Sequence, residues 1–322
     1  MGLIENPKTY TGRDLETIFF RPMFKGDNAE ALGIRMLYNM PVPTTIQLWS
    51  PQSNILQEYS SGWSGGESAN RKQKSIELHK IKAEVGFSAS DYFQQVYELI
   101  TGRADVNLDD LTGSELEQAE TEMFRAAIAE SLRVMMWVGD TEGSRYNKFD
   151  GFLSLAHKRS ELGVVPTTDV TAALTSDNVV ELFNKMWAAA SPQLKALKAE
   201  GQLVYFVSSD VYECYEQYLD KFGSDGAYTD LVSGRRELSY HGIKIVDMGI
   251  SQYLPLFSDG STSQCLLTDR RNLVLAVNTA DYPGSEVRMW YNPDQMENRQ
   301  RAIFMVGCEI MDEELMVLAT FA

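Results

Sequence analysis

The chain has 322 residues, of which 44% are hydrophobic and 23% are charged, and its formal net charge at pH 7 is −16. These values are typical of a globular protein of one to three domains. The acidic excess argues against a protein whose main work is to grip nucleic-acid phosphates, and no apolar run reaches the roughly 18 residues of a membrane span.

The first part of the chain predicts an arm and a hairpin. Residues 1–36 lack a sustained period and are interrupted by Pro and Gly, so we expect an arm rather than a core element. Residues 40–50 and 73–88 alternate as strands do and frame a polar, Gly- and Ser-rich segment, 51–72. In the second strand the apolar parity switches between Leu78 and Ile81, which predicts a bulge or a strong twist. A long two-stranded hairpin is expected, and it needs a partner surface because such a ribbon is marginally stable alone.

The clearest helix is predicted at residues 114–138. Thr112 and Ser114 each stand three positions before a Glu, as in a capping box. Acidic residues crowd its first half, where the helix dipole favours them. From Asp105 to Glu122 there are seven acidic residues and no Lys or Arg, a run that is typical of a solvated surface.

Mixed elements are predicted after a turn region at WVGDTEGSRYNKFDGF. One helix is expected at 177–190, and another runs from 211 to about 222 after a cap at Ser209 or Asp210. Six apolar runs predict strands at 203–207, 242–247, 265–277, 285–291, 302–310 and 315–321.

A serine hydrolase built on Ser64 is the alternative from another class of function. Ser64 lies in Gly62-Trp-Ser-Gly-Gly66, which satisfies the nucleophile-elbow pattern G-x-S-x-G. A weak strand precedes the motif and no apolar helix follows it, so a loop tip is the favoured interpretation. The sequence does not single out a base or an orienting acid among the remaining candidates, which are His79, His157, His241, Asp247 and Asp269.

Metal and cofactor sites are not expected. The three cysteines, Cys214, Cys265 and Cys308, are far apart and show no zinc-ligand spacing, so reduced thiols are expected. The acidic segment that starts at Asp105 has neither the Gly nor the Glu that an EF-hand loop needs. No phosphate-binding loop or dinucleotide fingerprint occurs, so no catalytic, cofactor-binding or metal-ligating residue is assigned.

Three local patterns resemble the major capsid proteins of tailed phages, which have the Hong-Kong-97-type fold. The first is IELHKIKAEVGFSASDYFQ followed by the long helix and WVGD…FDGF. The second is LVYFVSSDVYECYEQYLDKFG. The third runs from LSYHGIKIVDMGI through LLTDRRNLVLAVN to the C-terminal strands, in which Arg301 to Gly307 fits R-x-x-x-x-x-G. Residues 98–113 look like an insertion relative to this family.

The resemblance implies an α+β fold with four parts. These would be an N-terminal arm (1–36), an extended β-hairpin loop or E-loop (37–88), a peripheral or P domain (89–148 and 293–322) with the spine helix 114–138, and a mixed α/β axial or A domain (149–292). We could not place the Lys and Asn of the cross-link that some members form.

The function that the resemblance implies is structural and not enzymatic. A major capsid protein of a bacteriophage self-assembles into pentamers and hexamers of an icosahedral shell around double-stranded DNA, without sequence-specific binding. The implied partners are further copies of the chain, a scaffolding protein, a portal and decoration proteins, and the implied location is the virion, assembled in the host cytoplasm. An encapsulin-type compartment is the alternative with the same fold.

Overall fold

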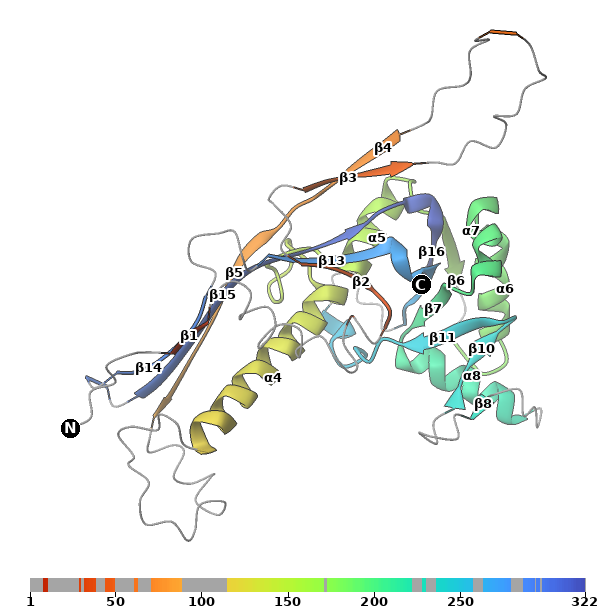
Figure 1. The fold of residues 1–322 in the computed structure, drawn as a ribbon. Coiled ribbons are helices and arrows are strands. Elements are labelled where there is room, and N and C mark those ends of the chain that lie inside the picture. Colours follow the sequence, from red (N-terminus) through yellow and green to blue (C-terminus); the bar gives the residue numbers. More distant parts are fainter. Residues whose placement is uncertain are drawn as a thin grey trace.

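The computed structural model describes residues 8–10, 29, 32–38, 44–49, 61–62, 71–88, 115–170, 173–221, 228–229, 236–256, 263–278, 286–292, 294–295 and 297–321. Two six-stranded sheets form the body, and a hairpin reaches away from it (Figure 1). Within the described residues, no helix is both long and apolar enough to cross a membrane.

The first sheet is organised around one long strand, β15. Strands β14 and β13 pair with successive halves of β15, and β5 pairs with its other edge. Strand β1 extends the sheet beside β14, and β2 extends it beside β13. The strands are β1 (Lys8–Tyr10), β2 (Arg35–Tyr38), β5 (His79–Ser88), β13 (Leu273–Asn278), β14 (Glu286–Asn292) and β15 (Glu297–Ile310).

Helix α4 (Glu115–Val138) packs against one face of this sheet and confirms the predicted helix at 114–138. Its buried row includes Phe124, Ile128 and Leu132, which join residues of β15 such as Phe304 in one apolar core. The last turn, from Val134 to Val138, is buried all round, as its apolar sequence predicts. Twenty-four residues make a rod of about 36 Å that runs beneath the sheet.

The second sheet has the strand order β10-β11-β7-β12-β16-β6. Its central strand β7 (Leu203–Val207) is buried throughout, and helices α6 (Val179–Ala189) and α8 (Ser209–Lys221) cover the aromatic core around it. The other strands are β6 (Thr167–Val170), β10 (Ser239–Tyr240), β11 (Ile243–Asp247), β12 (Cys265–Asp269) and β16 (Met316–Phe321).

The predicted strand at 265–277 is two strands that belong to different sheets. A 3-10 turn, η4 (Arg270–Asn272), separates β12 in the second sheet from β13 in the first. A second turn, η5 (Glu313–Leu315), separates β15 from β16 in the same way. The predicted strands at 302–310 and 315–321 place the second break correctly, at the acidic residues 312–314. The first break, at the polar residues 269–272, was not predicted, because strongly apolar runs stand on both sides of it.

Two further predictions differ from the structure. Ala29, Leu32 and Ile34 are buried in the main core, so this part of the predicted arm is not a free arm. The predicted two-stranded hairpin is shorter than expected, because only β3 (Thr44–Trp49) and β4 (Arg71–Ile76) pair with each other and β5 enters the first sheet. Helix α5 (Phe152–Glu161) and the short helix α7 (Pro192–Ala196) were not predicted.

Strand pairing also crosses the predicted domain boundaries. The resemblance places β13 and β14 in the axial part, but both pair with β15, and it places β16 in the peripheral part, but β16 pairs with β12. These pairings show that the parts share sheets, and the four-part division itself stays a prediction.

Candidate assembly site at the base of the hairpin

The β3–β4 hairpin projects from the body at the point where β4 ends and β5 begins (Figure 1). Residues Glu77 and Leu78 separate β4 from β5, so the chain breaks close to the predicted parity switch, as a gap between strands of two different sheets and not as a bulge within one strand. Ile76 packs on Val274 and Met311 in a small separate cluster, whereas Ile81 lies in the main core. At the parity switch the chain thus passes from β4, which lies on one face of the first sheet, to β5, which is a strand of that sheet.

Gly307 makes this crossing possible. A Cβ at this position would overlap the carbonyl oxygen of Glu77, far inside the 3.0 Å that real Cβ atoms keep from other heavy atoms. The backbone of β15 and the backbone at the end of β4 therefore touch without a side chain between them. Any larger residue would push the hairpin away from the sheet.

Four charged side chains fix the hairpin base to the body. Lys74 of β4 forms ion pairs with Glu313 and, at 3.9 Å, with Glu309. Arg159 of α5 pairs with the same two carboxylates, at 3.2 Å for Glu313. All four side chains are at most 22% exposed, so their attraction is screened less than that of surface pairs.

In this cluster, burial and the neighbouring positive charges act on the pKa of Glu313 in opposite directions. Burial disfavours its charged form, but the hydrogen bond from Lys74 and the positive charges of Lys74 and Arg159 outweigh burial. The pKa of Glu313 is therefore lower than its ordinary value. The carboxylate is held ionised and bridges the hairpin, α5 and the β15–β16 connection.

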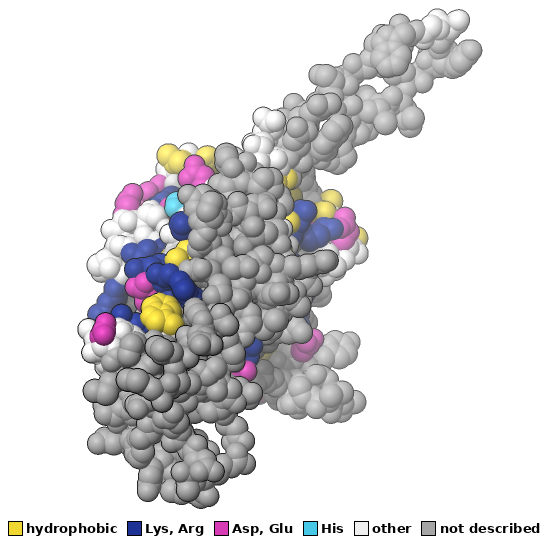
Figure 2. Space-filling view, turned by 60° about the vertical axis from the view of Figure 1, so that its left-hand side comes forward, with side chains coloured by type: hydrophobic (Ala, Val, Ile, Leu, Met, Phe, Trp, Pro, Cys, Tyr) yellow, Lys and Arg dark blue, Asp and Glu magenta, His cyan; other side chains and the backbone are white. Residues whose placement is uncertain are grey.

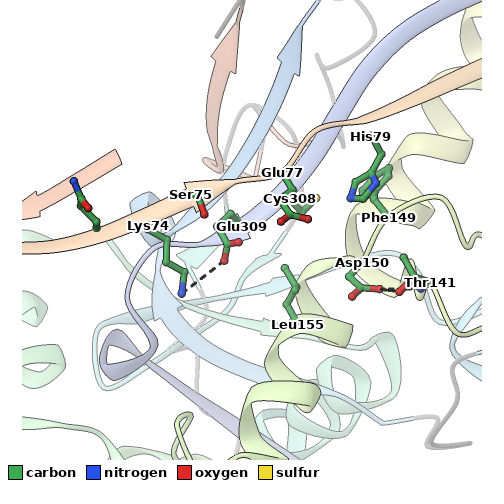
Figure 3. Close-up of a pocket in the computed structure, with 11 residues that line it drawn as sticks. Lys74, Ser75, Glu77, His79, Thr141, Phe149, Asp150, Leu155, Cys308 and Glu309 are labelled. Carbon is green, nitrogen blue, oxygen red and sulfur yellow. Dashed lines mark hydrogen bonds and ion pairs between the residues drawn. The ribbon is translucent and has the colours of Figure 1, made fainter. Parts of the chain in front are cut away.

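A mainly polar cavity of about 440 Å³ lies beside this cluster (Figure 3). Residues of the β4–β5 crossing line one side, and residues of the turn after α4, of α5 and of β15 line the others. Its lining includes Glu77, His79, Thr141, Asp150 and Cys308. No group of three or more potential metal ligands occurs in the described part of the chain.

Two glycines explain the motif WVGD…FDGF, which contributes Thr141, Phe149 and Asp150 to the cavity lining. A Cβ on Gly139 would lie 2.5 Å from the carbonyl oxygens of Met135 and Phe149, and one on Gly151 would lie 2.7 Å from that of Trp137. The Gly151 N–H donates to the Gly139 carbonyl at 2.8 Å, so the segment closes directly on the end of α4.

Two aspartates and Lys158 hold the same turn. The Lys158 ammonium binds Asp140 at 3.1 Å and Asp150 at 2.9 Å, and the Thr141 N–H donates to Asp150 at 2.8 Å. Burial disfavours the Asp150 carboxylate, yet these bonds outweigh it, and its pKa is lower than usual. The sequence motif is thus a rigid turn that carries α5 and its Arg159 into the charged cluster.

Among the described residues, the histidines and aspartates weighed for a hydrolase do not come together as a catalytic set. Ser64 lies outside the described residues. Asp247 accepts hydrogen bonds from Ser209 and Gly249, and Asp269 binds Arg271. The three histidines lie in different places: His79 lines the cavity, His157 bonds to Gln264 at 3.0 Å, and His241 stacks on Tyr240 in the β10–β11 turn.

Comparisons by sequence found no relative. No family model matches the chain, and no curated protein matches it.

Comparisons by structure found phage capsids. A chain of the satellite phage P4 procapsid aligns with a TM-score of 0.61 at 9% identity, over 99% of this chain and 95% of that one. A chain of the capsid of an empty GTA particle aligns with a TM-score of 0.55 at 15% identity, over 92% and 91%. The capsid of cyanophage P-SCSP1u aligns with a TM-score of 0.52 at 11% identity, over 90% and 86%. The expected α+β capsid fold is confirmed over nearly the whole chain.

Proposed function

We propose, from the tailed-phage capsid fold that this chain has, that it is a major capsid protein and not an enzyme. Many copies would form pentamers and hexamers of an icosahedral shell around double-stranded DNA. The observation that carries the proposal is the match over 99% of this chain and 95% of a procapsid chain. The particles named above are phage and GTA particles, which disfavours the encapsulin-type alternative.

The projecting hairpin supports self-assembly. Strands β3 and β4 pair only with each other among the described strands, and an isolated two-stranded ribbon is marginally stable in water. Lying across a neighbouring subunit would bury the ribbon, while the charged cluster and Gly307 would set the direction in which it leaves the body.

The predicted parts of the chain follow from this proposal. We assign residues 1–36 to the arm, 37–88 to the E-loop, 89–148 and 293–322 to the P domain, and 149–292 to the A domain. A scaffolding protein, a portal and decoration proteins are the proposed further partners. The proposed location is the virion, with assembly in the host cytoplasm.

Expression followed by negative-stain electron microscopy tests the proposal. Hexamers, tubes or closed shells are expected from the purified protein. A stable monomer with esterase activity that is lost in Ser64→Ala would overturn the structural function. For a capsid subunit, Ser64→Ala assembles like the unmodified chain.

Deletion of residues 52–70 tests the hairpin in particular. The shortened protein is expected to fold, because the deleted residues lie beyond the paired strands β3 and β4, and to fail in assembly. Circular dichroism checks the fold, and Ser64→Ala, which changes the same segment without shortening it, is the matched control. Unaltered shells from the deletion would refute the role of the hairpin.

A further inference from the structure

The face of the first sheet that points away from α4 carries an unusual set of side chains. Along β15 the even-numbered residues, such as Ala302 and Phe304, are buried against α4. The odd-numbered residues Glu297, Arg299 and Arg301 therefore point to the opposite face. Near the hairpin, β4 covers this second face through the cluster around Ile76. Farther from the hairpin, charged residues occupy it.

Cross-strand register gathers positive charge on this face. Arg301 stands opposite Arg288 of β14, and Arg299 stands opposite Trp290. On the other edge of β15, Ile303 stands opposite Lys82 and Met305 opposite Lys80. We call this set the basic face; it comprises Lys80, Lys82, Arg288, Trp290, Arg299 and Arg301.

Positive charge exceeds negative charge on the basic face. The guanidinium of Arg301 lies over the Trp290 ring, 5.6 Å from its centre. Among the described residues, three carboxylates share the face with its five cations: Glu84, which binds Lys82 at 2.8 Å, Glu297, which binds Arg299 at 3.4 Å, and Glu286, which stands opposite Ile303 in the strand register. In the view of Figure 2, Lys and Arg side chains gather at the left with apolar and acidic side chains among them.

A basic face is unexpected in a chain of net charge −16, and the chain also supplies its counterpart. Residues 105–122, the acidic block, contain seven carboxylates and no Lys or Arg. The C-terminal part of this block, from Glu115, forms the first turns of α4. Thr121 of these turns contacts Met289 on the buried face of β14, at 3.5 Å between Oγ1 and Sδ. The sheet therefore separates this part of the block from the basic face of the same subunit.

We propose that the basic face binds the acidic block of a neighbouring copy of the chain. This inference rests on the proposed function, because it needs many copies in contact. Opposite charges on two surfaces of one chain steer copies into a single orientation, and like-charge contacts penalise the alternatives. Arg and Trp are also the residues that interfaces favour, since a planar guanidinium binds carboxylates in a fixed geometry.

A polyanion of another class, a nucleic acid, is the competing occupant. Phosphates bind Arg and Lys as carboxylates do. A second copy is favoured over a nucleic acid as the occupant, because every subunit that contacts another carries one acidic block. The same block would repel a nucleic acid that approached the subunit.

Charge reversal in matched pairs tests the proposal. The face variant carries Lys82→Glu and Arg299→Glu, whose side chains are 58% and 36% exposed, so folding is expected to survive. The block variant carries Glu117→Lys and Glu120→Lys. The control variant, Lys185→Glu with Lys244→Glu, makes the same change in charge at exposed ion-paired residues outside the first sheet.

Assembly is measured by sedimentation velocity at about 0.15 M salt, where surface charges still interact over about 8 Å. The face variant and the block variant are each expected to weaken association at least about tenfold, which corresponds to about 1.4 kcal/mol. The control variant is expected to assemble like the unmodified chain. Combining all four face and block reversals in one chain restores assembly, and so does mixing the face variant with the block variant.

Three outcomes overturn the inference. The face variant could assemble like the control, or the combined variant could stay defective although circular dichroism shows that it is folded. In the third, the face variant assembles normally but loses nuclease-protected nucleic acid, which identifies the face as a nucleic-acid surface.

A separate readout keeps this inference distinct from the proposed function. If the unmodified chain forms no hexamers, tubes or shells, the proposed function fails. Zero-length carbodiimide cross-linking of a mixture of nitrogen-15-labelled and unlabelled copies then tests the contact directly. Cross-links between Lys82 of one copy and residues 105–122 of another support the inference, and their absence at high protein concentration overturns it.

Discussion

The side chain of Asn272 and the backbone of Asp312 are joined by two hydrogen bonds of opposite direction. The Asn272 amide donates to the Asp312 carbonyl at 2.8 Å, and the Asp312 N–H donates to the Asn272 oxygen at 2.8 Å. Each residue lies where the chain passes between the two sheets, Asn272 between β12 and β13 and Asp312 between β15 and β16. One side chain thus links both crossings.

Asn272→Ala is expected to destabilise the fold by about 2 kcal/mol or more. The substitution removes both of these hydrogen bonds to the Asp312 backbone, and losing one partner of a hydrogen bond away from solvent costs about 1–3 kcal/mol. Denaturant unfolding measures the loss. Asn147→Ala is the control, because that amide makes a single 3.2 Å bond within a surface turn and should cost less than about 1 kcal/mol. Equal losses would contradict the role of Asn272.

Gly307→Ala is expected to destabilise the protein and to disturb the hairpin. The new Cβ would overlap the Glu77 carbonyl, and such overpacking typically costs about 1–3 kcal/mol. Gly86→Ala provides a control in the neighbouring strand, because its Cβ would meet only the flexible end of Glu297, at 3.5 Å. That change should stay within about 0.5 kcal/mol. Thermal unfolding and electron microscopy of both variants test this, and a well-assembled Gly307→Ala protein would refute the close crossing.

Stability should fall in acid partly through Glu313. Its pKa in the folded protein is below the ordinary value of 4.5, so around that pH the unfolded chain binds more protons than the folded chain. The stabilisation is present above pH 4.5 and is lost as pH falls through the lower folded value. Lys74→Met should flatten this dependence at and below about pH 4.5.

Lys82→Met is the control for the pH measurement. Its ammonium pairs with Glu84 at 2.8 Å, but both side chains are about half exposed, so little of the acid dependence should change. Urea unfolding at a series of pH values supplies the curves. A Lys74→Met curve parallel to that of the unmodified protein would show that the hairpin base contributes nothing.

The three thiols should differ in reactivity. Cys265 and Cys308 are buried, and burial raises the pKa of both, so few thiolates form and reagents cannot reach them. Cys214 on α8 is half-buried, and burial raises its pKa as well. Alkylation of the native protein followed by mass spectrometry should label Cys214 slowly and spare the others, whereas unfolding in urea should expose all three. Rapid native labelling of Cys308 would show that the cavity beside it is open.

Much of the architecture follows from local sequence patterns. The period of 3.6 residues and the capping-box residues predict α4 to within one residue, and the run from Leu203 to Val207 predicts β7. The parity switch between Leu78 and Ile81 predicts the break before β5. These signals depend only on neighbouring residues, because the burial pattern of each element repeats along its own short sequence.

The candidate site could be predicted only in outline. The hairpin was expected, but the partners of Lys74 were not, because Arg159, Glu309 and Glu313 lie far from it along the chain. The basic face left a signal that could have been found: Arg299 and Arg301 alternate with buried residues, as do Arg288 and Trp290. Only cross-strand register brings these pairs together.

The sequence by itself thus determined most of the elements and their order, since periodicity and turn residues act over a few positions, and the resemblance of three local patterns to capsid proteins indicated the type of fold. The tertiary structure decided which sheet each buried strand joins. An apolar strand is equally well buried in either sheet, so β12 and β13 look like one strand until Asn272 and Asp312 meet. It also decided which glycines are indispensable, because the close approach of Gly307 to Glu77 depends on a strand more than two hundred residues away.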